Sequence, residues 1–333
     1  MEQHAHLLRT RARVRIFSLP CNGWVGMLRQ WRISNLLTCS LFCLGSSVAA
    51  RLWAGHKGVV ISHGFSSIGF ACDLVVAHGC WAGYVERTNQ KRGGFGYVIY
   101  AAEWMAAHLA RHVAAVSDSV ANQWCQYYGL NPHKAFVQLN SIDPAVFFAQ
   151  VEAQNPCEGQ ICRVLFVGRF EQGKGTAFLS ALHEEMGSTP SKFQVVICSP
   201  TKVAEKEMRR LPRFQFLSGL NSVEIAIEYN KADLFLLPSL YEAFELSTIE
   251  ALACGTPVLL NDTGSRPTLE KLGCPGLFRL EHAPSGLAAL QLAAEQFMGL
   301  KRLQLSQWTH QHFDGRMSNE ALIAFCLSQG DRR

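Results

Sequence analysis

Residues 238–258 have the sequence Pro238-Ser-Leu-Tyr-Glu-Ala-Phe-Glu-Leu-Ser-Thr-Ile-Glu-Ala-Leu-Ala-Cys-Gly-Thr-Pro-Val258. Two carboxylates, Glu242 and Glu250, stand in this run with seven residues between them. The apolar run Asp233-Leu-Phe-Leu-Leu237 just before it predicts a short buried parallel strand, and Val258-Leu-Leu260 predicts the next one. A strand, a loop, a helix N-terminus and a second strand form the unit with which α/β proteins hold phosphates and nucleotides.

This run resembles the motif of the retaining glycosyltransferases of family 4, in which two glutamates seven residues apart stand between a Pro-Ser turn and an Ala-Cys-Gly-Thr-Pro-Val run. The resemblance implies an α/β protein of GT-B type, with two Rossmann-like domains facing across a cleft. It also implies that Glu250 holds the ribose of a nucleotide sugar and that Glu242 contacts the donor sugar. Further candidates for donor binding in the same run are Phe244, Leu246, Ser247 and Thr248.

A structural role for Glu250 is the alternative. Ser247-Thr-Ile-Glu250 also fits a capping box, in which Ser247 and Glu250 satisfy free amides at the start of a helix. Both roles are compatible in part, because a capped helix N-terminus still presents amides and a positive dipole end to a pyrophosphate.

A second segment, Arg163-Val-Leu-Phe-Val-Gly-Arg-Phe-Glu-Gln-Gly-Lys-Gly175, predicts a buried strand followed by a glycine-rich loop. The resemblance implies that Arg169 and Lys174 in this loop neutralise the donor's phosphates. Two fixed cations would stabilise a departing diphosphate without a metal ion. The rival interpretation is a P-loop, but Gly175 stands where the metal-binding Ser or Thr of that motif belongs.

The N-terminal part matches the family less closely. Asp73-Leu-Val-Val-Ala77 predicts a strand that ends at His78, and the resemblance implies that this histidine faces the donor sugar from the first domain. His63 is the weaker competitor, and a structural histidine at a strand end is the alternative. Gly23 and Gly26, after a predicted first strand, are the candidates for close backbone approach to the donor phosphates.

Length and composition predict two domains. At 333 residues and 48% hydrophobic content, the chain can build two packed cores. The resemblance implies that residues 1–150 form an acceptor-side Rossmann-like domain and that residues 161–315 form a Rossmann-like nucleotide-sugar-binding domain. It also implies that a C-terminal helix over 316–333 packs back on the first domain. The twelve cysteines show no regular spacing and no zinc-site pattern, which indicates reduced thiols in the cytoplasm and no metal site.

Charge is uneven along the chain. Residues 1–150 hold 13 Lys and Arg against 6 Asp and Glu, a net charge of +7, while the remainder is at −2. Such a basic half is compatible with a peripheral contact to the anionic inner face of a membrane, or with ordinary solvated charge. Residues 33–50 carry no charge, but they are polar enough to predict a buried helix in place of a membrane span. No nucleic-acid-binding pattern is present.

Two positions depart from the family, which often has glycine where this chain has Ala243 and Glu245. Glu245 would alter donor preference or point to solvent. The sequence thus predicts a metal-independent retaining glycosyltransferase without a cofactor, which moves a sugar from a nucleoside-diphosphate sugar to a hydroxyl of a glycan or lipid-linked acceptor. A nucleotide-sugar epimerase on the same fold, or a nucleotide-sugar-binding scaffold or inactive subunit, are the alternatives.

Overall fold

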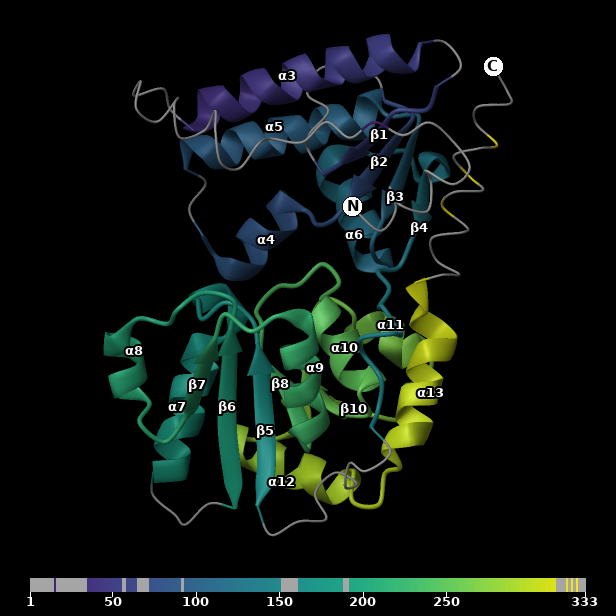
Figure 1. Ribbon diagram of the computed structural model, residues 1–333. Helices are drawn as coiled ribbons and strands as arrows, with labels where there is room; N and C mark the ends of the chain where they lie inside the picture. The colour runs from purple at the N-terminus through teal and green to yellow at the C-terminus, as the bar shows by residue number, and fades with distance from the viewer. Residues whose placement is uncertain are drawn as a thin grey trace. The chain divides into compact units, whose positions relative to one another are not determined.

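The computed structural model describes residues 15, 35–55, 58–64, 72–90, 93–150, 161–187 and 192–315, together with Leu322, Phe325 and Ser328 (Figure 1). The chain divides into two compact units. Unit 1 comprises Met1–Leu139 and Arg316–Arg333, and unit 2 comprises Asn140–Gly315. The predicted limits at residues 150 and 161 stay a prediction, since residues 151–160 lie outside the described part of the chain.

Unit 1 is built on a parallel sheet of the order β1-β2-β3-β4. Its described elements are α3 (Asn35–Ala54), β1 (Ile61–His63), β2 (Leu74–Ala77), α4 (Trp81–Thr88), α5 (Gly94–Leu109), β3 (His112–Ala115), α6 (Asp118–Tyr128), η1 (Pro132–Lys134) and β4 (Ala135–Val137). Strand β2 is buried along its whole length, as expected of a central parallel strand covered on both faces.

The C-terminal segment contributes to the core of unit 1. Leu322 is buried in one cluster with Leu74, Val76 and Ala114, and Phe325 packs against the same cluster. The ring of Phe325 lies 5.0 Å from that of His112 on β3. Residues at the end of the chain therefore help to hold a sheet whose strands begin near residue 60.

Unit 2 is built on a second parallel sheet, of the order β10-β9-β8-β5-β6-β7. Its elements are β5 (Cys162–Val167), η2 (Gln172–Lys174), α7 (Thr176–Gly187), β6 (Phe193–Ser199), α8 (Glu205–Arg210), β7 (Gln215–Ser218), α9 (Ser222–Lys231), β8 (Leu234–Leu237), α10 (Leu246–Ala253), β9 (Val258–Leu260), α11 (Arg266–Lys271), β10 (Leu277–Arg279), η3 (Leu280–His282), α12 (Gly286–Gln296) and α13 (Arg302–Phe313). Strands β5, β8 and β9 form its buried centre.

The strand order of unit 2 reverses between β5 and β8. From β5 the chain builds outward through β6 and β7, and then returns to the other side of β5 to lay down β8, β9 and β10 (Figure 1). Ligands of open parallel sheets bind outside the carboxyl ends of the strands at such a reversal. The sheet topology therefore places the loops after β5 and β8 at the expected binding position, and the predicted α/β class is confirmed.

Two strands and one helix form where the sequence predicts them. The strand predicted at 258–260 forms as β9, and the one predicted at 233–237 forms as β8. Residues 35–50 of the uncharged segment are helical as part of α3, but the helix is only partly buried, since Leu44 is 42% exposed and Ser47 is 9% exposed. None of the described helices is long and apolar enough to cross a membrane.

Candidate donor-binding site

The candidate site lies at the carboxyl ends of β5 and β8. Arg169 and Lys174 follow β5, and Glu242 follows β8. Because these two strands are hydrogen-bonded neighbours, the loops that follow them meet at one edge of the sheet. The structure therefore brings together two of the loops in which the sequence placed functional residues.

The two loops are in direct contact. The backbone N–H of Leu240 donates to the carbonyl of Gly173 at 2.9 Å. Gly175 ends η2 in the left-handed region, with φ of 83°. A Cβ at this position would lie 2.2 Å from the carbonyl oxygen of Pro238, so the contact requires glycine both for its conformation and for its size.

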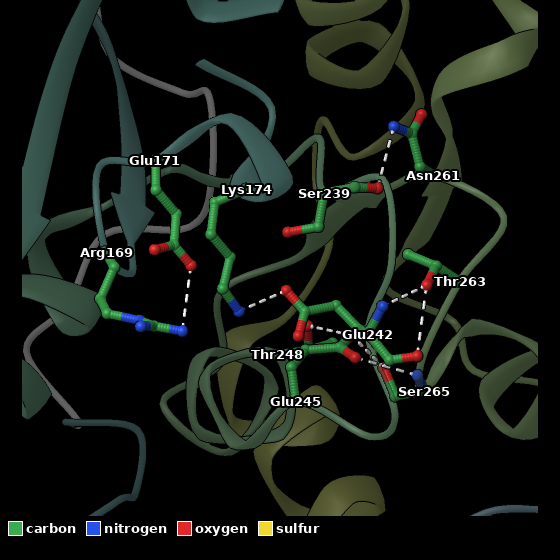
Figure 2. A network of polar contacts seen from close by, with 10 residues as sticks. All are labelled: Arg169, Glu171, Lys174, Ser239, Glu242, Glu245, Thr248, Asn261, Thr263 and Ser265. Atoms are coloured by element: carbon green, nitrogen blue, oxygen red, sulfur yellow. Dashed lines mark hydrogen bonds and ion pairs between the residues drawn. The ribbon is translucent and has the colours of Figure 1, made fainter. Parts of the chain in front are cut away.

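Lys174 and Glu242 form an ion pair at the centre of this edge. The Nζ of Lys174 lies 2.5 Å from Oε1 of Glu242, and the two side chains are only 23% and 10% exposed (Figure 2). The backbone of Glu242 is also held, because its N–H donates to Oγ1 of Thr263 at 2.5 Å. Two opposite charges that are largely shielded from water, as Lys174 and Glu242 are, can orient a charged substrate more strongly than surface charges can.

Arg169 lies on the same loop but in a different environment. Its guanidinium pairs with Glu171 at 3.0 Å, and both side chains are largely in solvent, at 63% and 42% exposure (Figure 2). An exposed pair of this kind contributes little to stability, and its arginine exchanges partners at little cost.

Helix α10 begins differently from the predicted capping box. Its N-cap is Glu245 and its first residue is Leu246, so Ser247 lies inside the first turn and cannot cap it. Thr248 is buried, and its hydroxyl donates to Oε1 of Glu245 at 2.7 Å. The side chain of Leu246 is 45% exposed. The capping box between Ser247 and Glu250, which was the alternative role of these residues, is therefore not formed.

Glu245 does not point to solvent. It is buried, and its carboxyl group accepts hydrogen bonds from the N–H and the hydroxyl of Ser265, at 3.0 and 2.5 Å. Burial, and then the charge of Glu242, raise the pKa of this carboxyl group to about 7. This residue thus links the loop after β8 to the loop after β9 (Figure 2).

Glu250 lies on α10, about one turn after its first residue, Leu246. It accepts a hydrogen bond from the hydroxyl of Tyr229 on α9 at 3.2 Å. Burial raises the pKa of Glu250 to about 7, and the bond from Tyr229 opposes this rise. The side chain is therefore a half-buried hydrogen-bonding group, which is the property that a carboxylate needs to bind a pair of ribose hydroxyls.

Phe244 is part of the core of unit 2. Its ring lies 6.0 Å from that of Phe313 on α13, and the residue is 4% exposed. Its carbonyl oxygen accepts a hydrogen bond from the side chain of Asn140 at 2.9 Å. Phe244 therefore anchors the loop through its side chain.

His78 lies in unit 1, directly after β2. Its Nε2 lies 2.9 Å from Nδ1 of His63 at the end of β1, and the two rings stack with their centroids 5.2 Å apart. From the sequence, His78 and His63 were alternative candidates for the histidine that faces the donor sugar. In the structure they contact each other at the carboxyl edge of one sheet. Gly23 and Gly26 lie outside the described residues.

Sequence reasoning missed the loop after β9. Thr263, Gly264 and Ser265 contact both glutamates of the loop after β8. The run Asn261-Asp-Thr-Gly-Ser265, a polar loop directly after a predicted strand, was the available signal. Within the described ranges, no three His, Cys, Asp or Glu side chains are grouped as a metal site would require.

Comparison with known proteins agrees with the geometry of unit 2. Residues 162–290 match the family described as Glycosyl transferases group 1. Alpha-maltose-1-phosphate synthase of Mycobacterium tuberculosis is 27% identical over 209 residues, which cover 56% of this chain and 53% of that protein. The chain spans about half to two thirds of the length of the first curated relatives that it matches.

Solved structures share the fold over most of the chain. WaaG, a glycosyltransferase involved in lipopolysaccharide biosynthesis, superposes with a TM-score of 0.68 at 15% identity, over 98% of this chain and 94% of WaaG. HepE of Anabaena, crystallised with UDP and glucose, superposes with a TM-score of 0.59 at 17% identity, over the same shares of both chains. Residues 162–290 therefore match the Glycosyl transferases group 1 family, in a chain that has the fold of the GT-B glycosyltransferases.

Proposed function

We propose that this protein is a retaining, metal-independent glycosyltransferase of family 4. It would move a sugar from a nucleoside-diphosphate sugar to a hydroxyl group of a glycan or lipid-linked acceptor. The observation that carries the proposal is the half-buried pair of Lys174 and Glu242 at the strand-order reversal of unit 2. HepE, a protein of the same fold, was crystallised with UDP-glucose as well as with UDP and glucose, which supports a nucleotide-sugar donor.

The loop after β5 suits the leaving group. As the glycosidic bond breaks, negative charge develops on the departing diphosphate, and preorganised cations stabilise that charge. Lys174 would supply the inner cation, and Arg169 would turn from its exposed partner Glu171 to supply the outer one. Amides of the first turn of α10, near Ser247 and Thr248, would add hydrogen bonds to the phosphates.

The other residues would hold the two ends of the donor. Glu250 would accept hydrogen bonds from the ribose hydroxyls, and Glu242 would position the sugar. His78 would hydrogen-bond the sugar from unit 1, with His63 orienting its ring. In this arrangement the cations of one loop take the part that a divalent metal plays in other transferases.

Donor binding in a thermal-shift panel tests this proposal. The probes are UDP-glucose, GDP-mannose, ADP-glucose and dTDP-glucose, each with and without EDTA. We expect one of them to raise the melting temperature, with no effect of EDTA and with the shift lost in Arg169→Ala and Glu250→Ala. A ligand at about 100 times its Kd adds about 2.7 kcal/mol, which is several degrees.

A matched control is Arg209→Ala. Arg209 also pairs with a carboxylate, Glu205 at 2.6 Å, and is 76% exposed, but it lies on α8. We expect this variant to keep the full shift. Stabilisation that depends on a divalent metal, or a folded protein that none of the four nucleotide sugars stabilises, would count against the proposal.

We also propose that the protein makes a peripheral contact with an anionic membrane. Exposed Leu52 and Trp53 on α3 and Trp104 on α5 belong to unit 1, and residues 1–150 carry a net charge of +7. Aromatic side chains and excess positive charge together favour an anionic lipid surface. Co-sedimentation with vesicles is the test: binding should require anionic lipid and weaken with salt, and equal binding to zwitterionic vesicles would contradict it.

A further inference from the structure

Glu245 is a buried carboxyl group that joins two loops of the candidate site. It accepts hydrogen bonds from Thr248 of α10 at 2.7 Å and from the hydroxyl and N–H of Ser265, the N-cap of α11, at 2.5 and 3.0 Å. The two donors of Ser265 hold the loop that carries Glu242 against the loop after β9 (Figure 2). The position of Glu242 therefore depends on a neighbouring carboxyl group.

Gly264 shows how closely the two glutamates approach this second loop. A Cβ on Gly264 would lie 1.9 Å from Oε2 of Glu245 and 2.6 Å from Cβ of Glu242. The glycine has φ of 60°, in the left-handed region. Both glutamates thus pack against the same glycine, which makes them close neighbours.

The negative charges of Glu242 and Glu245 are no longer balanced once Lys174 binds another anion. Glu242 is neutralised by Lys174 from the loop after β5. Glu245 faces the charge of Glu242 on one side and only neutral donors from α10 and α11 on the other. Next to Ser265, Arg266 at the start of α11 pairs with Asp262 at 3.4 Å, with Glu270 at 3.2 Å and with Glu281 at 2.5 Å.

We propose that Glu245 is a positioning residue for the donor site, and that its carboxyl group takes up one proton from solvent when the donor's diphosphate engages Lys174. This inference rests on the proposed function, because it requires Lys174 to bind a diphosphate. When Lys174 divides its charge between the diphosphate and Glu242, the charge of Glu242 acts on the buried carboxyl group of Glu245 with less compensation. A less compensated like charge nearby favours the protonated form of a carboxyl group.

The environment of Glu245 in the free protein is already close to this state. Its pKa is raised to about 7 by burial and by the charge of Glu242, while Lys174 still neutralises Glu242. When Lys174 neutralises Glu242 less completely, Glu245 binds its proton more tightly still. No covalent step is involved: a proton passes from water or buffer to a carboxylate oxygen, and Thr248 and Ser265 keep the carboxyl group in place.

Calorimetric titration in two buffers measures the proton directly. The probe is whichever of UDP-glucose, GDP-mannose, ADP-glucose and dTDP-glucose stabilises the protein, titrated at pH 8 in phosphate and in Tris, which differ in ionisation enthalpy. The intact nucleotide sugars carry only phosphate diesters, so they do not titrate in this range. We expect the wild-type protein to take up close to one proton per donor bound.

The variant Glu245→Gln keeps the shape of the side chain and removes its titration. We expect it to bind the donor with no proton uptake, whereas Glu205→Gln, a surface control on α8 at 77% exposure, should behave as the wild type does. As a second measurement on the wild type alone, donor affinity should fall above pH 7, by up to about tenfold per pH unit.

The outcomes separate the two proposals. Donor binding without proton uptake, or uptake that persists in Glu245→Gln, would overturn this inference and leave the proposed function standing. An affinity that does not change between pH 7 and pH 8.5 would do the same. If none of the four nucleotide sugars binds the folded protein, the proposed function fails and this inference fails with it.

Discussion

At the scale of single residues, the candidate site is defined by charges that have been partly removed from water. Glu242 is 10% exposed and has one cation, Lys174, at 2.5 Å. Removing one member of a buried pair costs more than the pair itself contributes, because the remaining charge stays buried without compensation. The pair is therefore a feature whose loss should be visible in stability as well as in donor binding.

Replacement of Lys174 tests this. We expect Lys174→Met to lower the free energy of unfolding by about 2 kcal/mol, and the double variant Lys174→Met/Glu242→Gln to recover most of it. The control Lys231→Met should cost less than about 0.5 kcal/mol, since Lys231 is 56% exposed and its partner Glu228 keeps Arg163 at 2.5 Å. Urea melts measure all three, and equal losses in the two single variants would contradict the account.

The close packing at Gly264 makes a second prediction. We expect Gly264→Ala to cost about 2 kcal/mol or more, from the left-handed conformation and from the contact with Glu245. In a Glu245→Gly background part of this cost should disappear, which gives a coupling of about 1 kcal/mol in a double-mutant cycle. Strictly additive effects would mean that the two residues do not share one position.

Buried carboxyl groups also make stability depend on pH. Burial raises the pKa of Glu250 from 4.5 to about 7, so the folded state holds this proton more tightly than the unfolded state. The resulting stabilisation is complete below about pH 4.5 and is lost as the pH rises to about 7, by at most about 1.4 kcal/mol per pH unit.

Glu250→Gln should therefore flatten the pH profile of stability. We expect its melting temperature to fall less than that of the wild type between pH 5 and pH 7.5, although Glu103 and Glu245, both raised to a pKa of about 7, still contribute. Thermal melts of both proteins across this range provide the measurement. A wild-type profile that runs parallel to that of the variant would show that Glu250 titrates normally.

At the scale of elements, the site depends on three loops that leave β5, β8 and β9. The loop after β5 meets the loop after β8 through Gly175, and the loop after β8 meets the loop after β9 through Glu245. Each contact joins segments that are far apart in the sequence. Parallel sheets with helical crossovers bring such loops to one edge as a matter of topology.

Gly175→Ala tests the first of these contacts. We expect a loss of stability and weaker donor binding, because a Cβ would meet the carbonyl oxygen of Pro238 and displace the loop that carries Lys174. Gly299→Ala is the matched control: its φ of 80° imposes a similar backbone cost, and nothing lies within 4 Å of its Cβ position. If the two variants lose the same stability and bind the donor equally well, the contact with Pro238 has no role.

The positions of the strands that carry the site could be predicted from the sequence. The apolar runs that became β5, β8 and β9 are short and bounded by Gly or Pro, which is why their positions were predicted closely. The capping box that was the alternative role of Ser247 and Glu250 does not form, because α10 begins at Leu246 and Ser247 already lies within its first turn. The buried contacts of Glu245 could not be predicted, because they depend on a loop twenty residues further along the chain.

At the scale of the whole molecule, the chain forms two units that are not two continuous segments. Leu322, near the C-terminus, is 4% exposed in the core of unit 1 with Leu74 of β2. Composition and length could indicate two cores but not this return of the chain, which was expected for residues 316–333 from the family resemblance alone. The same limit applies to the pair of His63 and His78, whose partnership follows from the register of β1 with β2.

A crystal structure of the protein with a bound nucleotide sugar tests the central claim most directly, namely that the carboxyl edge of β5 and β8 is the donor site. We predict the diphosphate within hydrogen-bonding distance of Lys174, the ribose at Glu250, and the sugar beside Glu242, with Glu245 still bonded to Ser265. A nucleotide bound at any other place in unit 2, with the pair of Lys174 and Glu242 undisturbed, would contradict this account.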